Sequence, residues 1–200
     1  GQWHSVQIVV SMTNKTFKIF VDGFQRAAGD NKEFDFYGDI TTLNRVSFDC
    51  TSGNMLIDDF KLYLGAPQGE DDDSGDGSEQ AGNADFSDGF AAFNPFVGSA
   101  APVNNSWWIT TAGNAALTDA GNVKITSLRY SIAEGVAQDY TVEFKYQLPS
   151  GSRATLKMGT GVKSTTLQVG LTLRGGDDSI GDRIKADGYT ESVIFGGVGQ

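Results

Sequence analysis

Residues 3–21, WHSVQIVVSMTNKTFKIFV, decide the fold class of this chain. Across residues 3–10, and again across residues 16–21, apolar side chains recur at alternate positions, the period of a half-buried β-strand. Asn14-Lys15 supplies turn residues between the two runs, and Asp22-Gly23 follows the second run with turn chemistry. We therefore predict a β-hairpin at the start of the chain.

The same pattern continues along most of the sequence. No stretch has a helical period, and Asn, Asp and Gly interrupt the chain roughly every 8–12 residues, a spacing typical of sandwiches and jelly rolls. We expect an all-β fold. Its further strands are predicted at residues 33–36, 43–48, 55–64, 107–110, 122–127, 140–147, 154–158, 165–173 and 189–195.

Composition excludes several classes of protein. The 200 residues are 39% hydrophobic and 20% charged, so the chain can build a core. A net charge of −10 argues against a nucleic-acid partner, and no apolar run is long enough to span a membrane. Cys50 is the only cysteine, which excludes an intrachain disulfide and a multi-cysteine zinc site. Because the sequence starts at Gly1, we expect a processed chain or a fragment.

Nearly all of the negative charge lies in one segment. Residues 66–88 carry eight acids and no base, whereas the flanking sequences are close to neutral. Such a segment is typical of a solvated, disordered linker. We therefore divide the chain into residues 1–65, an acidic linker at 66–84, and residues 85–200. Neither flank is complete as a sandwich, since each leaves edges and an apolar face uncovered.

The first flank resembles the C-terminal half of a concanavalin A-like, laminin-G-like jelly roll. The resemblance rests on GQWHSV (residues 1–6), KIFVDG (18–23) and MLIDDFKLY (55–63). In that family these blocks are a core strand that enters with Trp, a hairpin strand that ends in an Asp-Gly turn, and the closing strand. The second flank resembles an N-terminal half, through DFSDGF (85–90) and DYTVEF (139–144).

The halves therefore stand in reversed order, and Gly199-Gln200 repeats Gly1-Gln2. Three explanations remain open at this point. The chain can be a window cut from a tandem array, a circular permutant, or a subunit that exchanges halves with its neighbours, an arrangement that can build filaments. We expect partners to be copies of the chain or neighbouring repeats.

Relatives with this sandwich include glycosidases, for which the resemblance implies a Glu-x-Asp-x-x-Glu strand. The sequence has no such strand, so we expect no catalytic residues and no enzyme. His4, the only histidine, is expected to be a half-buried or surface strand residue, because the sequence has no nucleophile elbow.

Calcium and sugars are the candidate ligands. Carboxylates are grouped in Asp58-Asp59, in the linker at Asp72 and Asp76, and in the loop at Asp177 and Asp178 with Asp182 nearby. For Asp58-Asp59 a structural hydrogen-bonding role competes with the Ca²⁺ role, and the linker lacks the acid that an EF-hand needs at position 83. Exposed aromatic rings can stack on sugars, and the candidates are Trp107, Trp108 and Tyr189, although adjacent Trp107 and Trp108 must face opposite sides of a strand.

Together these features predict an extracellular or cell-surface structural or adhesion protein. It would be a tandem repeat or filament subunit with sandwich halves completed by its neighbours. The alternative is a carbohydrate-binding module, assisted by Ca²⁺, which rests on the resemblance of the fold and on the aromatic residues.

Overall fold

The structure, a computed structural model, describes residues 1–27, 30, 32–65, 86–88, 96–97, 106–110, 113–161, 164–176, 181–189 and 193–195. The predicted all-β class is confirmed. Among the described residues the only helical element is a 3-10 turn at Ser164–Thr166, and none forms a helix that could cross a membrane.

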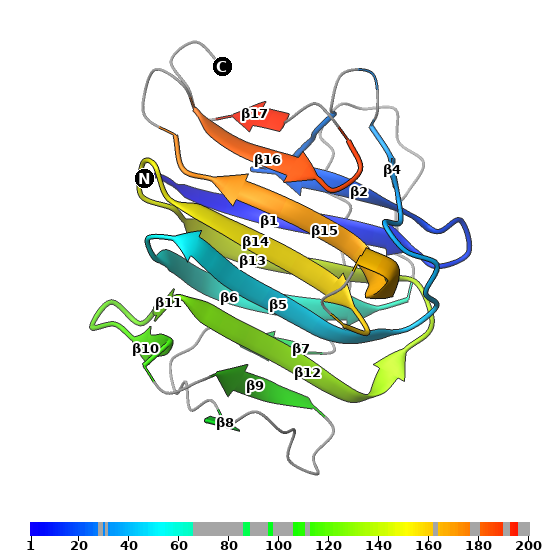
Figure 1. Cartoon of the computed structure of the whole chain (residues 1–200), viewed down its shortest axis with the longest axis horizontal. Coiled ribbons are helices and arrows are strands. Elements are labelled where there is room, and N and C mark those ends of the chain that lie inside the picture. The colour runs from blue at the N-terminus through cyan, green and yellow to red at the C-terminus, as the bar shows by residue number, and fades with distance from the viewer. Residues whose placement is uncertain are drawn as a thin grey trace.

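Two sheets lie face to face and form the two layers of the molecule (Figure 1). The nine-stranded sheet contains β1 (Trp3–Ser11), β2 (Thr16–Val21), β3 (Phe24–Gln25), β4 (Phe34–Asp35), β6 (Met55–Leu64), β7 (Phe86–Asp88), β10 (Ala115–Leu117), β11 (Val123–Ile125) and β13 (Tyr140–Gln147). The eight-stranded sheet contains β5 (Leu43–Ser52), β8 (Phe96–Val97), β9 (Ser106–Thr110), β12 (Ser127–Val136), β14 (Arg153–Gly159), β15 (Leu167–Arg174), β16 (Asp182–Ala186) and β17 (Val193–Phe195).

Strand pairing is antiparallel except between β8 and β9. The main path through the first sheet is β10-β11-β6-β13-β1-β2-β3, and the path through the second is β17-β16-β15-β14-β5-β12-β9-β8. Strands from residues 1–65 and strands from the later sequence are therefore mixed in both sheets. In particular, β13 lies between β6 and β1, and β5 lies between β14 and β12.

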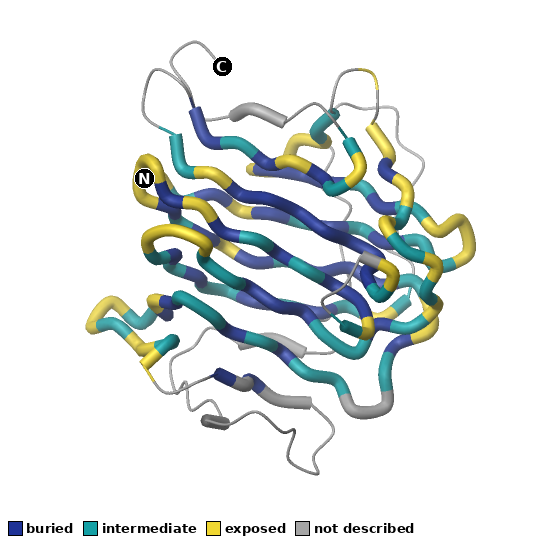
Figure 2. The backbone as a smooth tube through the Cα atoms, in the orientation of Figure 1, coloured by how far each residue is buried: buried dark blue, intermediate teal, exposed yellow. Residues whose placement is uncertain are grey.

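The core lies between the sheets, and along most long strands buried residues alternate with more exposed ones (Figure 2). Its centre is a group of aromatic rings from both layers. Phe48 on β5 packs edge-on against Phe144 on β13, with ring centroids 5.1 Å apart. Phe60 on β6 contacts Trp108 and Tyr130 at 4.9 and 5.3 Å. These contacts join residues of the first and later parts of the chain.

Most predicted strands are present. The strand at residues 55–64 has the predicted ends, whereas β3, β7, β8, β10, β12 and β16 were not predicted, and residues 165–166 of the predicted strand 165–173 lie in the 3-10 turn. The predicted strand at residues 189–195 is wrong at its start, since Tyr189 lies in a turn with its N–H donated to the carbonyl of Ala186, and β17 begins at Val193. The predicted linker, residues 66–84, lies outside the described residues.

Candidate functional site

A depression of about 240 Å³ lies on the outer face of the nine-stranded sheet. Strands β1, β2, β6 and β13 form its floor. Most of the residues that line it are at outward positions, whereas Val6 and Phe144 belong to the core. The lining residues are Ser5, Val6, Gln7, Phe20, Gly23, Asp59, Lys61, Glu143, Phe144 and Lys145. Polar groups and one aromatic ring, that of Phe20, therefore meet in one hollow.

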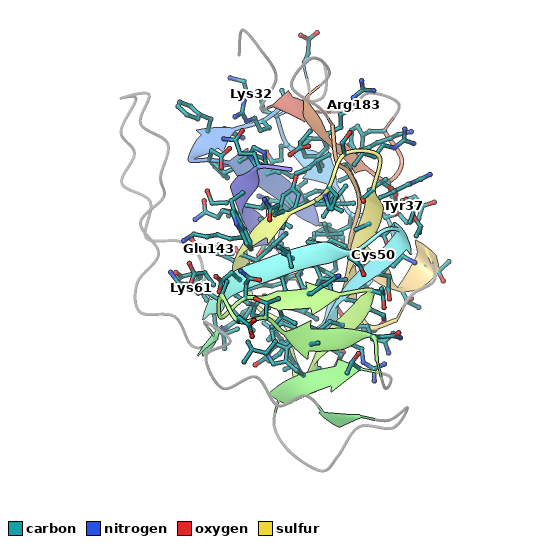
Figure 3. All side chains as sticks on the ribbon, turned by 90° about the vertical axis from the view of Figure 1, so that its left-hand side faces the viewer. Lys32, Tyr37, Cys50, Lys61, Glu143 and Arg183 are labelled. Atoms are coloured by element: carbon teal, nitrogen blue, oxygen red, sulfur yellow. The ribbon has the colours of Figure 1, made fainter. Side chains whose placement is uncertain are left out.

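Glu143 is held at the centre of this depression from two sides. Gln7 Nε2 donates a hydrogen bond of 2.8 Å to one carboxylate oxygen, and the Tyr63 hydroxyl donates one of 2.9 Å to the other. Burial, followed by the hydrogen bond and the charge of Glu143, raises the pKa of Tyr63 to about 12. Lys61 lies opposite Glu143 in the strand register, and the two residues lie close together on one side of the molecule (Figure 3).

Asp58 and Asp59 form an irregular step in β6 beside the depression. The register with β13 shifts between Glu143 and Lys145, and Asp59 adopts a φ of 48°, in the left-handed region. Asp59 forms an ion pair of 2.5 Å with Lys145, and this hydrogen bond raises the pKa of Lys145. Asp58 accepts the backbone N–H of Asp59 at 2.8 Å. Both carboxylates are thus engaged in local contacts.

Fixed polar groups beside an aromatic ring can hold a small polar ligand, because their orientation is set before the ligand arrives. The carboxylates that line the depression are Asp59 and Glu143, and each already has a partner. The depression can therefore offer hydrogen bonds and an apolar surface to a ligand.

A second polar cluster lies near the start of β1. His4 is buried, with 2% of its surface exposed, so our expectation of a half-buried or surface histidine is wrong. Its Nδ1 lies 2.7 Å from a carboxylate oxygen of Asp22, and its Nε2 lies 2.8 Å from one of Asp182. The second oxygen of each acid accepts a backbone N–H, from Ser5 and from Gly176 respectively.

Burial alone would lower the pKa of His4, since it disfavours the charged ring. The hydrogen bonds and charges of Asp182 and Asp22 outweigh this effect, and the pKa of His4 is raised above its usual 6.5. The cluster joins β1 in one sheet to β16 in the other. We regard it as a structural clamp, because both ring nitrogens face carboxylates.

The aromatic candidates occupy different places. Trp108 is buried at 7% exposure and packs on Phe60 and Tyr130, the core position expected for one of the two adjacent tryptophans. Trp107 is opposite Ser131 in the register of β9 with β12, and its side chain is outside the described part. Tyr189 is half-buried, packs edge-on against Phe34, and accepts the N–H of Asp35 through its hydroxyl oxygen.

The metal candidates are not brought together by the described residues. Asp72, Asp76, Asp177 and Asp178 lie outside them, and Asp182 faces His4. Within the described ranges, no group of three His, Cys, Asp or Glu side chains could hold a metal ion.

Sequence reasoning did not find Gln7, Phe20, Glu143 or Lys145 as members of one depression. Gln7 and Glu143 are 136 residues apart and meet only because β1 pairs with β13. Their outward positions on predicted strands were the only available signal, and that signal does not identify the neighbouring strand.

Comparisons with known proteins do not indicate a family or a function for this chain. No protein-family model matches the chain, and no curated protein matches it significantly.

Proposed function

We propose that this chain is a structural and adhesive subunit of an extracellular or cell-surface assembly, with sandwich parts shared between copies or neighbouring repeats. The observation that carries the proposal is the mixed order of strands. Removing β5 would divide the eight-stranded sheet, and removing β13 would divide the other sheet. Each part of the chain therefore supplies a central strand that the other part needs.

This mutual dependence favours exchange. The strand registers that unite the two parts, such as Ser5 opposite Lys145, can form between two copies with the same hydrogen bonds. The acidic sequence between the parts has 19 residues, 66–84, and like charges favour an extended chain. A long extended connection lets one part reach a neighbour. If one part of each copy pairs with the complementary part of the next copy, the assembly grows head to tail.

Cysteine pairs across the β1–β13 boundary test this proposal. In a Cys50→Ala background, we would introduce Ser5→Cys and Lys145→Cys, which lie opposite each other in the register. Linkage with a short thiol-reactive cross-linker should give a ladder of dimers and larger species on a denaturing gel. Light scattering before cross-linking should show a mass above the 21.3 kDa of one chain.

Ser11→Cys with Thr16→Cys provides the matched control. These positions face each other in the β1–β2 hairpin, within one part of the chain, so their linkage stays within a chain under either arrangement. If the boundary pair also links only within monomers, and scattering shows single chains, the proposal of shared parts is wrong.

Carbohydrate binding is the second candidate, and the depression around Glu143 favours it. Sugar ligands need oriented hydrogen-bonding groups and an aromatic or apolar surface. Gln7 and Glu143 offer the hydrogen-bonding groups, and Phe20, which is 5% exposed, offers a small apolar surface. A glycan array, read with Ca²⁺ and with EDTA, tests this candidate. Signals lost in Gln7→Ala but kept in Gln147→Ala, a matched change on β13 outside the depression, would support it. An array without signals in both buffers would contradict it.

A further inference from the structure

The outer face of the eight-stranded sheet carries far more bases than acids. We call this surface the basic face. Along β5, β12, β14, β15 and β16 the buried side chains point inward, and the residues that alternate with them point out. Seven outward positions hold Arg45, Arg129, Arg153, Lys157, Arg174, Arg183 and Lys185.

Few acids oppose these charges. Among the described residues, Asp49 is outward on β5 and accepts a hydrogen bond from Ser127, and the carboxylate of Asp187 lies over Gly170. None of the seven bases forms an ion pair with a described acid. Burial, followed by repulsion from Arg129, lowers the pKa of Arg45. Over the described residues, which leave out Asp177 and Asp178 between β15 and β16, the face is therefore cationic in a protein whose net charge is −10.

Three arginines make one row across adjacent strands. Arg153 on β14 is directly opposite Arg174 on β15, which is directly opposite Arg183 on β16. Like charges directly opposite each other destabilise a sheet. Beside the row lies a hollow of about 270 Å³, which Arg174 and Arg183 line together with Ser150 and four glycines. Figure 3 shows Arg183 on the side of the molecule away from Lys61 and Glu143.

An anionic chain would remove this repulsion, and the protein contains one. Residues 66–88 hold eight of its acids and no base, with four consecutive acids at positions 70–73. This segment supplies −8 of the net charge of −10, so it is the main source of negative charge in the sequence. Extended acidic peptides can pair with guanidinium groups through charge-assisted hydrogen bonds.

In the same copy, residues 70–73 are at the limit of their reach to the arginine row. The segment starts after Gly65, next to the end of β6 at Leu64, while Arg153 is opposite Ser52, beside the turn into the other end of β6 at Met55. The strand between these ends spans about 30 Å, and the face belongs to the other sheet, about 10 Å further away. Eight extended residues reach only about 28 Å from Gly65 to Asp73. A second copy has no such limit.

We propose that the basic face, with the row Arg153, Arg174 and Arg183 at its centre, binds the acidic segment of another copy of this chain. This contact deepens the proposed function, on which it rests, because it places copies in a head-to-tail order independently of strand exchange. It is predicted to weaken as the salt concentration rises, since exposed charges are screened.

The test is fluorescence anisotropy with a labelled peptide of residues 66–85, APQGEDDDSGDGSEQAGNAD. The receptor is the full chain carrying E70Q, D71N, D72N and D73N, so that its own acids do not compete. Adding Arg153→Gln, Arg174→Gln and Arg183→Gln should weaken peptide binding about tenfold or more. The control triple, Lys18→Gln, Lys32→Gln and Lys124→Gln, removes the same charge from exposed or half-exposed positions off the basic face, and should change binding less than about twofold.

Near-ultraviolet circular dichroism of both triple variants verifies that they fold. Equal loss of binding in the two triples, or no peptide binding at low salt, would overturn the proposal. Binding of a sulfated polysaccharide without binding of the peptide would overturn it as well. If the peptide binds while the cysteine ladder is absent, the contact stands and strand exchange fails. If the ladder forms without peptide binding, exchange stands and the contact fails.

Discussion

At the scale of single residues, His4 connects parts of the chain that are far apart in the sequence. It contacts Asp22 at the end of β2 and Asp182 on β16, and the ring of Tyr146 lies 5.9 Å away. The hydroxyl of Tyr146 is buried and has no hydrogen-bond partner in the described part of the chain. A positive imidazolium offsets one of the two carboxylate charges in this site, and a neutral ring would leave both acids uncompensated.

The raised pKa of His4 predicts how stability depends on pH. A group with a pKa that is higher in the folded state stabilises the fold fully below its unfolded pKa, near 6.5, and this contribution is lost as pH rises through the folded pKa. Burial also raises the pKa of Cys50 to about 11, so this thiol adds a loss of stability that begins only near pH 9, where the unfolded thiol ionises. We expect the Tm to fall as pH rises above about 6.5.

His4→Gln should remove most of this decline, because the variant keeps every other titrating group. We also expect the free energy of unfolding of the variant to be about 3 kcal/mol lower at pH 6. This value is at the lower end of the range for breaking a buried ion pair, because the side chain of Asp22 is 41% exposed. Urea unfolding of both proteins from pH 6 to 9 measures the effect. Equal pH dependence in the two proteins would show that His4 does not act as this clamp.

At the scale of secondary-structure elements, the strand β5 has the most consequential position. Among the described residues of 1–65, it is the only strand in the eight-stranded sheet, and it has strands of the later sequence on both sides. Phe48 lies at its middle, is fully buried, and packs edge-on against Phe60 and Phe144 of the opposite sheet. This strand therefore stabilises both its own sheet and the packing between the two layers.

Phe48→Ala should destabilise the protein by about 3–5 kcal/mol, since it leaves a cavity where rings from both sheets meet. Thr51→Ala on the exposed end of the same strand should change stability by less than about 0.5 kcal/mol. Chemical denaturation of the two variants makes the comparison. A loss below about 1 kcal/mol for Phe48→Ala would mean that the core closes around the missing ring.

Sequence patterns predicted elements well where the alternation was long and bounded by turns. The strand β6 has the predicted ends, since Gly53-Asn54 precedes it and Gly65 follows it. The strand β12 was missed because Ala133, Glu134 and Gly135 interrupt the alternation of Leu128, Tyr130 and Ile132. Five-residue β16 lies between glycine-rich turns and offers too few positions for a period.

The candidate sites could not be predicted in the same way. Asp22-Gly23 was recognised as a turn and Asp182 as part of an acidic loop, but no local signal connects either acid to His4. The basic face could not be predicted for the same reason, since Arg153, Arg174 and Arg183 belong to three different strands. Sequence periodicity defines the side of a strand that a residue occupies, whereas tertiary pairing defines its neighbours.

At the scale of the whole molecule, the two parts behave as complementary pieces of one core. Residues 1–65 supply β1, β5 and β6, and residues 85–200 supply β12, β13 and β14, and these six strands interleave. Each part alone would expose one side of its strands and the edges on which the other part normally pairs. Exposed edges of this kind are what strand exchange between copies needs.

We therefore predict that residues 1–65 and residues 85–200, prepared as separate polypeptides, fold only when they are mixed. Neither polypeptide alone should show a cooperative thermal transition, because without β5 or β13 a sheet is divided and the aromatic centre is open. An equimolar mixture should gain near-ultraviolet circular dichroism and a single concentration-dependent transition. Adding Phe48→Ala to the first polypeptide should weaken the association, and Thr51→Ala should not. Cooperative folding of either polypeptide by itself would show that the parts are independent, and the structural basis for exchange between copies would be lost.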